Sequence, residues 1–278
     1  MFTIIQYKDV AMNHMDDKGT ALVTGASSGI GAAYAEALAK RGHNLILTAR
    51  DEARLTARAA RLRAEAGVLV EVLPADLTAP AGLATVARRL REDSAITLLI
   101  NNAGMNASRP LAESDPNELA ALMALNVAAP VQLAAAAAQG FAARGRGGIV
   151  NIASVLALAP EMSDAVYAGT KAFILAMTQK LHLELAPLGI QVQAVLPGLT
   201  RTEIFERSGR DLSALPPGMI MEPEELVEAA LAGLSQGELV TIPSLADPAL
   251  WNAFEAARRA LGPHLSLDHA AARYQTAS

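Results

Sequence analysis

Cysteine is absent from this chain of 278 residues, and aromatic residues make up only 4% of it. Without a thiol, the chain can form no disulfide, no thiolate metal site and no thiol nucleophile. Its five histidines are scattered and none forms an HExxH pair, so we expect no metal site. These absences exclude thiol chemistry and disfavour zinc chemistry.

Long apolar runs and long basic runs are absent as well. No stretch reaches about 18 uninterrupted apolar residues, so we expect no membrane-spanning helix. The net charge of −5 argues against nucleic acid or an anionic membrane surface as the main partner. Residues 1–17 lack the continuous apolar region of a signal peptide, so we interpret them as a flexible N-terminal extension of a cytoplasmic protein.

The chain is instead rich in apolar residues (52%), arranged as short apolar runs that alternate with longer helical patterns. The predicted strands are Ala21–Thr24, Asn44–Thr48, Leu69–Leu73, Ile96–Ile100, Gly148–Ala153, Gln191–Leu196 and Leu239–Ile242. The predicted helices are Gly29–Arg41, Glu52–Ala66, Ala81–Glu92, Asn117–Arg144, Ala165–Ala186, Glu224–Leu234 and Pro248–Leu261. This alternation predicts an α/β fold with a parallel sheet covered on both faces. We expect a single domain over residues 18–278, with a helical tail at about residues 244–278.

A glycine-rich turn follows the first predicted strand and opens the first predicted helix. It reads Thr24-Gly25-Ala26-Ser27-Ser28-Gly29-Ile30-Gly31. Gly25 can take turn geometry closed to a residue with a Cβ, Gly29 would let the backbone approach a pyrophosphate, and Gly31 would let the helix pack near the strand. The free N–H groups of a helix N-terminus favour phosphate. This context predicts a dinucleotide site rather than a purely structural turn.

The end of the second predicted strand indicates which dinucleotide binds. Sites that prefer NAD usually place an acid there to bind the ribose hydroxyls. This chain has Ala49 and then Arg50, while Asp51 is placed to cap the next helix. A guanidinium can pair with a 2′-phosphate, so we expect NADP(H) to be preferred, with NAD(H) as the alternative. Otherwise Arg50 only begins a solvated helix.

Tyr167 and Lys171 form an i,i+4 pair, which in a helix places both side chains on one face. A phenol has an ordinary pKa of about 10, and a neighbouring ammonium lowers it by favouring the phenolate. The pair therefore suits proton exchange with an alcohol or ketone oxygen. By itself the spacing is a weak signal, because such pairs are common on solvated faces.

Together these motifs resemble the short-chain dehydrogenase/reductase family over roughly Lys18 to Pro243. After the glycine turn come Asp76, Asn101-Asn102-Ala103-Gly104, Asn126, Ser154, Tyr167-xxx-Lys171 and Pro197-Gly198, in the order of that family. No element of the family's catalytic set is missing. The resemblance implies a Rossmann-like doubly wound sheet of about seven parallel strands and NAD(P)-dependent oxidoreduction of a carbonyl or alcohol.

The resemblance also implies a role for each matching residue. Tyr167 would be the general acid in reduction and the base in oxidation, and Lys171 would lower its pKa and hold the nicotinamide ribose. Ser154 would bind the substrate oxygen, and Asn126 would anchor a water of a proton relay. The residues implied to bind the cofactor are Gly25, Ser27, Ser28, Gly29, Ile30, Gly31, Arg50, Asp76, Leu77, Asn102, Ala103, Gly104, Tyr167, Lys171, Pro197, Gly198 and Thr202.

Alternatives remain open at this stage. Ser154 and Asn126 could be ordinary hydrogen-bonding residues and Asp76 could cap a turn, whereas Asn101 is expected to stabilise the sheet. The chain could alternatively be a 3-oxoacyl carrier-protein reductase, which would have a different class of substrate. A cofactor-sensing regulator is a third interpretation, but it would have little reason to keep the Ser, Tyr and Lys together. Nucleotide-sugar epimerases and dehydratases are usually longer.

Apolar residues close to the motifs indicate the kind of substrate. They are Met105, Leu156, Leu158 and Met162, together with Phe205, Leu215, Met219 and Met221 after the sixth predicted strand. They predict an apolar pocket that prefers a medium or bulky ketone to a small charged keto acid. We also expect residues 117–144 and 165–186 to carry an apolar outer face, and the resemblance implies a homodimer or homotetramer.

Overall fold

The computed structural model describes residues 18–106, 109–203 and 218–274; the predicted extension 1–17 and the pocket residues Phe205 and Leu215 lie outside this part. Seven strands form one parallel sheet in the order β3-β2-β1-β4-β5-β6-β7. They are β1 (Thr20–Thr24), β2 (Asn44–Thr48), β3 (Val70–Val72), β4 (Ile96–Asn101), β5 (Gly147–Ile152), β6 (Ile190–Val195) and β7 (Val240–Thr241). The predicted parallel α/β sheet is confirmed.

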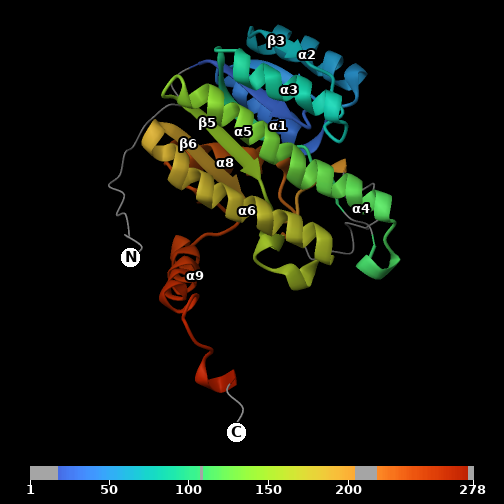
Figure 1. Ribbon diagram of the computed structural model, residues 1–278. Helices are drawn as coiled ribbons and strands as arrows, with labels where there is room; N and C mark the ends of the chain where they lie inside the picture. The colour runs from blue at the N-terminus through green and yellow to red at the C-terminus, as the bar shows by residue number, and fades with distance from the viewer. Residues whose placement is uncertain (1–17, 107–108, 204–217, 275–278) are drawn as a thin grey trace. The chain divides into compact units, whose positions relative to one another are not determined.

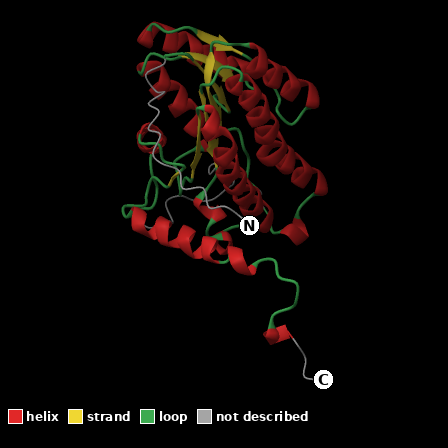
Figure 2. Cartoon of the chain, turned by 60° about the vertical axis from the view of Figure 1, so that its left-hand side comes forward, coloured by secondary structure: helices red, strands yellow, loops and turns green. Residues whose placement is uncertain are grey.

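Helices cover both faces of the sheet (Figures 1 and 2). One face carries α1 (Gly29–Lys40), α2 (Glu52–Ala66) and α8 (Pro223–Ser235), and the other carries α3 (Pro80–Glu92), α5 (Ala129–Ala142) and α6 (Ala165–Leu185). Along β1, Ala21 and Val23 belong to the first buried cluster and Leu22 to the second. Burial on both faces explains why these strands are apolar throughout rather than alternating.

The strand order reverses on either side of β1, because β2 and β3 extend the sheet one way and β4 to β7 extend it the other way. In open parallel sheets, ligands bind at such a reversal, beyond the carboxyl ends of the strands. The segments that leave β1, β2, β4, β5 and β6 at this edge begin with Gly25, Ala49, Asn102, Ala153 and Leu196. The topology therefore gathers the predicted motifs along one crevice.

The predicted helix over residues 117–144 is interrupted, which corrects the sequence-based expectation. It consists of α4 (Pro116–Met123), a π-helical turn (Ala124–Ala128) and α5. Pro130 has no N–H to donate to the carbonyl of Asn126 four residues earlier, so one bond of a regular helix cannot form there. The N–H of Ala129 instead bonds to the carbonyl of Ala124, five residues earlier. This wider turn carries Asn126.

The same helical stretch, Pro116–Ala142, is long and apolar enough to cross a membrane by length and composition alone. However, α5 contributes Leu133, Ala137 and Phe141 to the buried cluster between the sheet and α3. Packing in this core explains its apolar composition, because a buried helix is hydrophobic around most of its circumference. Exposed Met123 on α4 and Phe173 on α6 agree with an apolar outer face, while the dimer or tetramer stays a prediction.

The chain divides after Pro243 into two units. The second unit, Ser244–Ser278, contains α9 (Pro248–Ala260). The carboxylate of Asp247 caps this helix by accepting a hydrogen bond from the N–H of Ala249 at 2.9 Å. Trp251 stacks on Phe254 with ring centroids 5.6 Å apart. That this tail forms one domain with the sheet stays a prediction.

Candidate active site

The glycine turn has the geometry that its sequence predicts. Gly25 and Gly29 have φ values of +66° and +53°, a region that residues with a side chain rarely adopt. A Cβ on Gly31 would lie 2.3 Å from the carbonyl oxygen of Gly25, so any larger residue would displace the turn from α1. The turn therefore keeps its backbone open at the start of α1.

The start of α1 fits a phosphate group. Ser28 is the N-cap residue, yet its hydroxyl makes no capping hydrogen bond, and the first turn contains no acidic side chain. The first N–H groups of a helix have no partner within the helix and carry a partial positive charge. Ser27 and Ile30 lie in the same turn. This cradle of small residues and free donors matches a dinucleotide pyrophosphate.

Hydrogen bonds hold the Asn-Asn-Ala-Gly segment against this turn. The hydroxyl of Thr24 accepts hydrogen bonds from the N–H groups of Asn102 (2.9 Å) and Ala103 (3.0 Å). The amide of Asn102 donates to the carbonyl of Thr24 at 2.9 Å. These hydrogen bonds hold the carboxyl ends of β1 and β4 side by side. Thr24 is a positioning residue whose role sequence reasoning missed, although its place at the end of β1 was visible.

Arg50 follows β2 and Asp76 follows β3, and the charge of Arg50 acts on the carboxylate of Asp76. Hydrogen bonds from Thr78, at 2.7 Å from its hydroxyl and 2.9 Å from its N–H, lower the pKa of Asp76, and the charge of Arg50 lowers it further. Arg50 is exposed and forms no ion pair with any described residue. Leu77 is buried in the core, with 4% of the residue exposed.

Ser154 and Tyr167 meet beyond the carboxyl end of β5. The Ser154 hydroxyl accepts a hydrogen bond from the N–H of Leu156 at 3.2 Å and donates to the carbonyl of Pro197 at 3.5 Å. Tyr167 lies in the first turn of α6, where its N–H donates to the N-cap Asp164 at 2.8 Å. A side-chain interaction with Ser154 lowers the pKa of the Tyr167 phenol. The fold therefore brings these two predicted catalytic hydroxyls together.

Lys171 approaches the same phenol from one helical turn away. Its Nζ lies 5.6 Å from the centre of the Tyr167 ring and donates to the carbonyl of Ile152 at 2.9 Å. Burial lowers the pKa of Lys171 to about 8. The i,i+4 spacing on α6 and the carbonyl at the end of β5 together fix this ammonium beside the phenol.

Burial, not Lys171, dominates the acidity of the phenol, which corrects an expectation. Burial raises the pKa of Tyr167 to about 12, the hydrogen bond with Ser154 lowers it, and the charge of Asp164 raises it. Desolvation disfavours the phenolate more strongly than its neighbours favour it. Near neutral pH the phenol therefore holds its proton, as a general acid in a reduction requires.

The side-chain oxygen and nitrogen of Asn126 both bond to the backbone of the loop after β4. Its oxygen accepts from the N–H of Met105 at 2.9 Å, and its nitrogen donates to the carbonyl of Met105 at 2.8 Å. A Cβ on Gly104 would lie 3.3 Å from the Asn126 oxygen and 3.7 Å from Lys171 Nζ. The structure thus brings Asn126 close to Lys171 across Gly104.

Thr170 links these residues and was missed by sequence reasoning. Its hydroxyl donates to the carbonyl of Tyr167 at 2.8 Å and accepts a hydrogen bond from the Asn126 amide at 3.3 Å. The bond joins the π-helical turn to the catalytic turn of α6. A threonine directly before the lysine was the available signal, but a bond to its own helix is ordinary for threonine.

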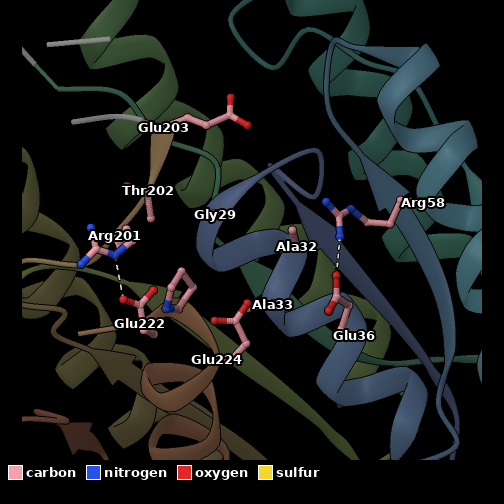
Figure 3. Close-up of a pocket in the computed structure, with 11 residues that line it drawn as sticks. Gly29, Ala32, Ala33, Glu36, Arg58, Arg201, Thr202, Glu203, Glu222 and Glu224 are labelled. Carbon is pink, nitrogen blue, oxygen red and sulfur yellow. Dashed lines mark hydrogen bonds and ion pairs between the residues drawn. The ribbon is translucent and has the colours of Figure 1, made fainter. Parts of the chain in front are cut away.

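The segment after β6 also reaches the glycine turn. A Cβ on Gly29 would lie 3.0 Å from the methyl carbon of Thr202, and the carbonyl of Gly198 accepts a hydrogen bond from Thr200 at 3.1 Å. Gly29 and Thr202 border a cavity of about 330 Å³ between α1 and the start of α8 (Figure 3). The predicted cofactor residues Pro197, Gly198 and Thr202 are therefore placed along the crevice.

The described residues of the predicted apolar pocket differ in their surroundings. Met105 and Leu156 contact the catalytic residues through their backbone, and Met162 and Met219 expose large apolar side chains. Met221 instead packs against the core, as the structural interpretation of these residues allows. For metals, no group of three or more His, Asp or Glu within the described ranges could hold an ion.

Comparison with known proteins gives consistent results. The profile of the family described as short chain dehydrogenase matches residues 19–213. A short-chain dehydrogenase from Sphingobium yanoikuyae in complex with NADPH is 54% identical, with a TM-score of 0.89 over 92% of this chain and 100% of the other. A bulky-bulky ketone specific alcohol dehydrogenase from Comamonas testosteroni is 48% identical, with a TM-score of 0.86 over 93% and 99%. D-beta-hydroxybutyrate dehydrogenase from Rhizobium meliloti is 30% identical over 90% of this chain and 96% of the relative.

Proposed function

Because the chain belongs to the short-chain dehydrogenase family, we propose that it is an NADP(H)-dependent reductase of bulky, apolar ketones. The reverse reaction would oxidise the corresponding secondary alcohols. The observation that supports this proposal best is the proximity of the buried Ser154 hydroxyl and the half-buried Tyr167 phenol, with Lys171 one turn away, beside a phosphate-binding turn.

Binding of the dinucleotide is assigned to the crevice at the carboxyl edge of the sheet. The N-terminus of α1 would hold the pyrophosphate, and Arg50 would pair with the 2′-phosphate of NADP. Asn102 and Thr202 border the same crevice. The cofactor would supply the hydride, and the residues of this chain would orient the carbonyl and provide the proton. The NADPH complex of the Sphingobium relative supports this choice of cofactor.

Proton transfer is assigned to the polar cluster at the start of α6. Ser154 would donate a hydrogen bond to the carbonyl oxygen and stabilise its developing negative charge. Tyr167, protonated at neutral pH, would give its proton to that oxygen. The ammonium of Lys171 would favour the phenolate that remains, and Asn126 would extend the path for reprotonation. Burial of Ser154, Lys171 and Asn126 around the half-buried Tyr167 makes these electrostatic effects stronger than they are in water.

Selection of a bulky ketone is supported by the surroundings of the cluster. Exposed apolar side chains at Met105 and Met162 offer contacts to substituents on the carbonyl carbon. Among the described residues, the catalytic cluster contains no arginine to bind a substrate carboxylate. The Comamonas relative, which is specific for ketones with two bulky groups, supports the same choice.

Consumption of NADPH with a panel of carbonyl compounds tests the proposal. Diaryl and long-chain dialkyl ketones should give a kcat/KM at least about tenfold above that of acetoacetate, since an unpaired carboxylate is costly to bury. Acetoacetyl thioesters test the 3-oxoacyl alternative. Higher activity with acetoacetate or a thioester would refute the bulky-ketone assignment, and absence of any turnover would favour a cofactor-sensing regulator.

A further inference from the structure

An ion pair joins two segments that lie on opposite sides of the glycine turn. Arg54 Nη1 lies 2.9 Å and 2.8 Å from the two carboxylate oxygens of Glu203. Arg54 is in the first turn of α2, which follows β2, and Glu203 follows β6. In the sheet, β2 and β6 lie on opposite sides of β1. A link between the segments that leave them at the carboxyl edge therefore crosses the end of β1.

A residue near each end of this link contacts the glycine turn. Next to Glu203, Thr202 packs against Gly29, the first residue of α1. One helical turn beyond Arg54, Arg58 binds Glu36 of α1 at 2.6 Å and points a second nitrogen at the carbonyl of Ser27, 3.5 Å away. The ion pair thus connects the start of α2 with the segment after β6, across the phosphate-binding end of the crevice.

Local structure holds Arg54 ready for this contact. Asp51, the N-cap of α2, accepts a hydrogen bond from the N–H of Arg54 at 3.0 Å, and its other oxygen lies 3.3 Å from Arg54 Nε. The hydrogen bond and charge of Glu203 raise the pKa of Arg54. The side chains of Arg54 and Glu203 remain 48% and 37% exposed, so solvent can separate them.

We propose that the Arg54–Glu203 pair is a strap that controls exchange of the dinucleotide, opening to admit or release it. The proposal rests on the cofactor site described above. A contact that spans the crevice must break before a ligand at the α1 N-terminus can pass between its two ends. Because the pair is exposed, it should retard exchange modestly rather than prevent it.

A second ion pair provides a matched control. Arg201 and Glu222 lie 2.7 Å apart, with 55% and 52% of their side chains exposed (Figure 3). They join the two ends of the segment after β6, where Arg201 N–H also donates to the carbonyl of Met221 at 3.0 Å. This pair has the same chemistry on the same segment, but it does not reach α2.

Stopped-flow fluorescence of NADPH and NADH tests the strap. Release is followed after a chase with excess NADP⁺ or NAD⁺, and equilibrium titration establishes that each variant binds. Glu203→Gln should accelerate release of both cofactors about two- to fivefold. Raised salt should accelerate release from the wild type more than from this variant, in which only the contacts to the cofactor phosphates are left to be screened. Glu222→Gln should release at the wild-type rate, and the charge-swapped Arg54→Glu, Glu203→Arg protein should recover slow release.

Three results would overturn the inference. Release from Glu203→Gln at the wild-type rate would show that the pair does not retard exchange. Equal acceleration in Glu222→Gln would assign the effect to the segment rather than to the strap. Weakened binding of NADPH but not NADH in Arg54→Ala would make Arg54 a 2′-phosphate ligand instead. A protein that binds neither cofactor would also refute the proposed function, whereas inactivity toward ketones would leave these rates measurable.

Discussion

The two ends of the crevice are built in different ways. At the phosphate end, the site consists of glycine backbone, free helix N–H groups and exposed arginines such as Arg50 and Arg54. At the catalytic end, three polar side chains are buried, since Asn126, Ser154 and Lys171 are each at most 7% exposed, and the half-buried Tyr167 lies beside them. The phosphate end offers backbone conformation and exposed charge to a ligand, whereas the catalytic end offers polar side chains that are shielded from water.

The difference determines how each end responds to change. Exposed charges are screened by solvent and salt, so each contributes modestly and can be replaced without loss of the fold. Buried polar groups have shifted pKa values and shared hydrogen bonds, so each substitution has a large effect. Choice and exchange of the cofactor should therefore be adjustable, while proton transfer should depend strongly on single atoms.

The largest expected effect tests the catalytic end. Tyr167→Phe removes one oxygen that the proposed mechanism uses as the acid, so kcat should fall by about 10²–10⁴. The Kd for NADPH should change little, because that affinity arises mainly at the other end. Ketone-dependent NADPH consumption and equilibrium fluorescence titration measure the two quantities.

Tyr34 supplies the matched control for this substitution. Tyr34 lies fully buried on α1, and its hydroxyl has no hydrogen-bond partner among the described residues. Tyr34→Phe should keep wild-type kcat, since no reacting group contacts that oxygen. Retention of kcat in Tyr167→Phe, or an equal loss in Tyr34→Phe, would contradict the assignment of the acid.

Most of the fold was predictable because its pattern is local. Apolar runs and helical periodicity predicted Asn44–Thr48 and Glu52–Ala66 with the bounds that the structure shows. The π-helical turn at Ala124–Ala128 was not predicted, although Pro130 was the signal for it. Its form depends on which carbonyl each N–H finally reaches, and hydrophobic periodicity does not determine that choice.

The active-site cluster was predictable as a set of residues but not in its energetics. Motif spacing named Ser154, Tyr167 and Lys171, which the fold brings together. The direction of the Tyr167 pKa shift was predicted wrongly, because desolvation depends on the whole surrounding core rather than on one neighbour. The Arg54–Glu203 contact was not predictable either, since it joins residues 149 positions apart.

The next effect concerns the stability cost of a buried ammonium. Burial lowers the pKa of Lys171 from 10.5 to about 8. Below pH 8, the Lys171 side chain holds its proton in both the folded and the unfolded chain, and the full desolvation cost of the buried ammonium opposes folding. Between pH 8 and 10.5 only the unfolded chain keeps it, so this contribution makes the free energy of unfolding rise with pH. Lys171→Met should remove that rise and add about 1–3 kcal/mol of stability at pH 7, less what the lost bond to Ile152 contributes.

Denaturant unfolding between pH 6 and 10.5 measures this contribution as the difference between wild type and variant. Lys180→Met is the control, because Lys180 lies on the same helix with 67% of its side chain exposed. Its difference from wild type should stay nearly constant with pH. A constant difference for Lys171→Met as well would mean that the ammonium is solvated in the folded protein.

The smallest expected effect concerns the choice of cofactor at the exposed end. Arg50 has no carboxylate partner within the described ranges, and a 2′-phosphate would give it an anionic partner. A charge-assisted pair of this kind favours binding by roughly ten- to a hundredfold, and exposure of Arg50 places the effect near tenfold. Arg50→Ala should weaken NADPH binding by about that factor, change NADH binding little, and reduce the salt dependence of the NADPH Kd. Arg88→Ala removes another exposed arginine, on α3, and controls for net charge. Fluorescence titrations with both cofactors at two salt concentrations separate the outcomes. Equal losses for NADPH and NADH in Arg50→Ala would show that the guanidinium acts on the general shape of the crevice rather than on the 2′-phosphate.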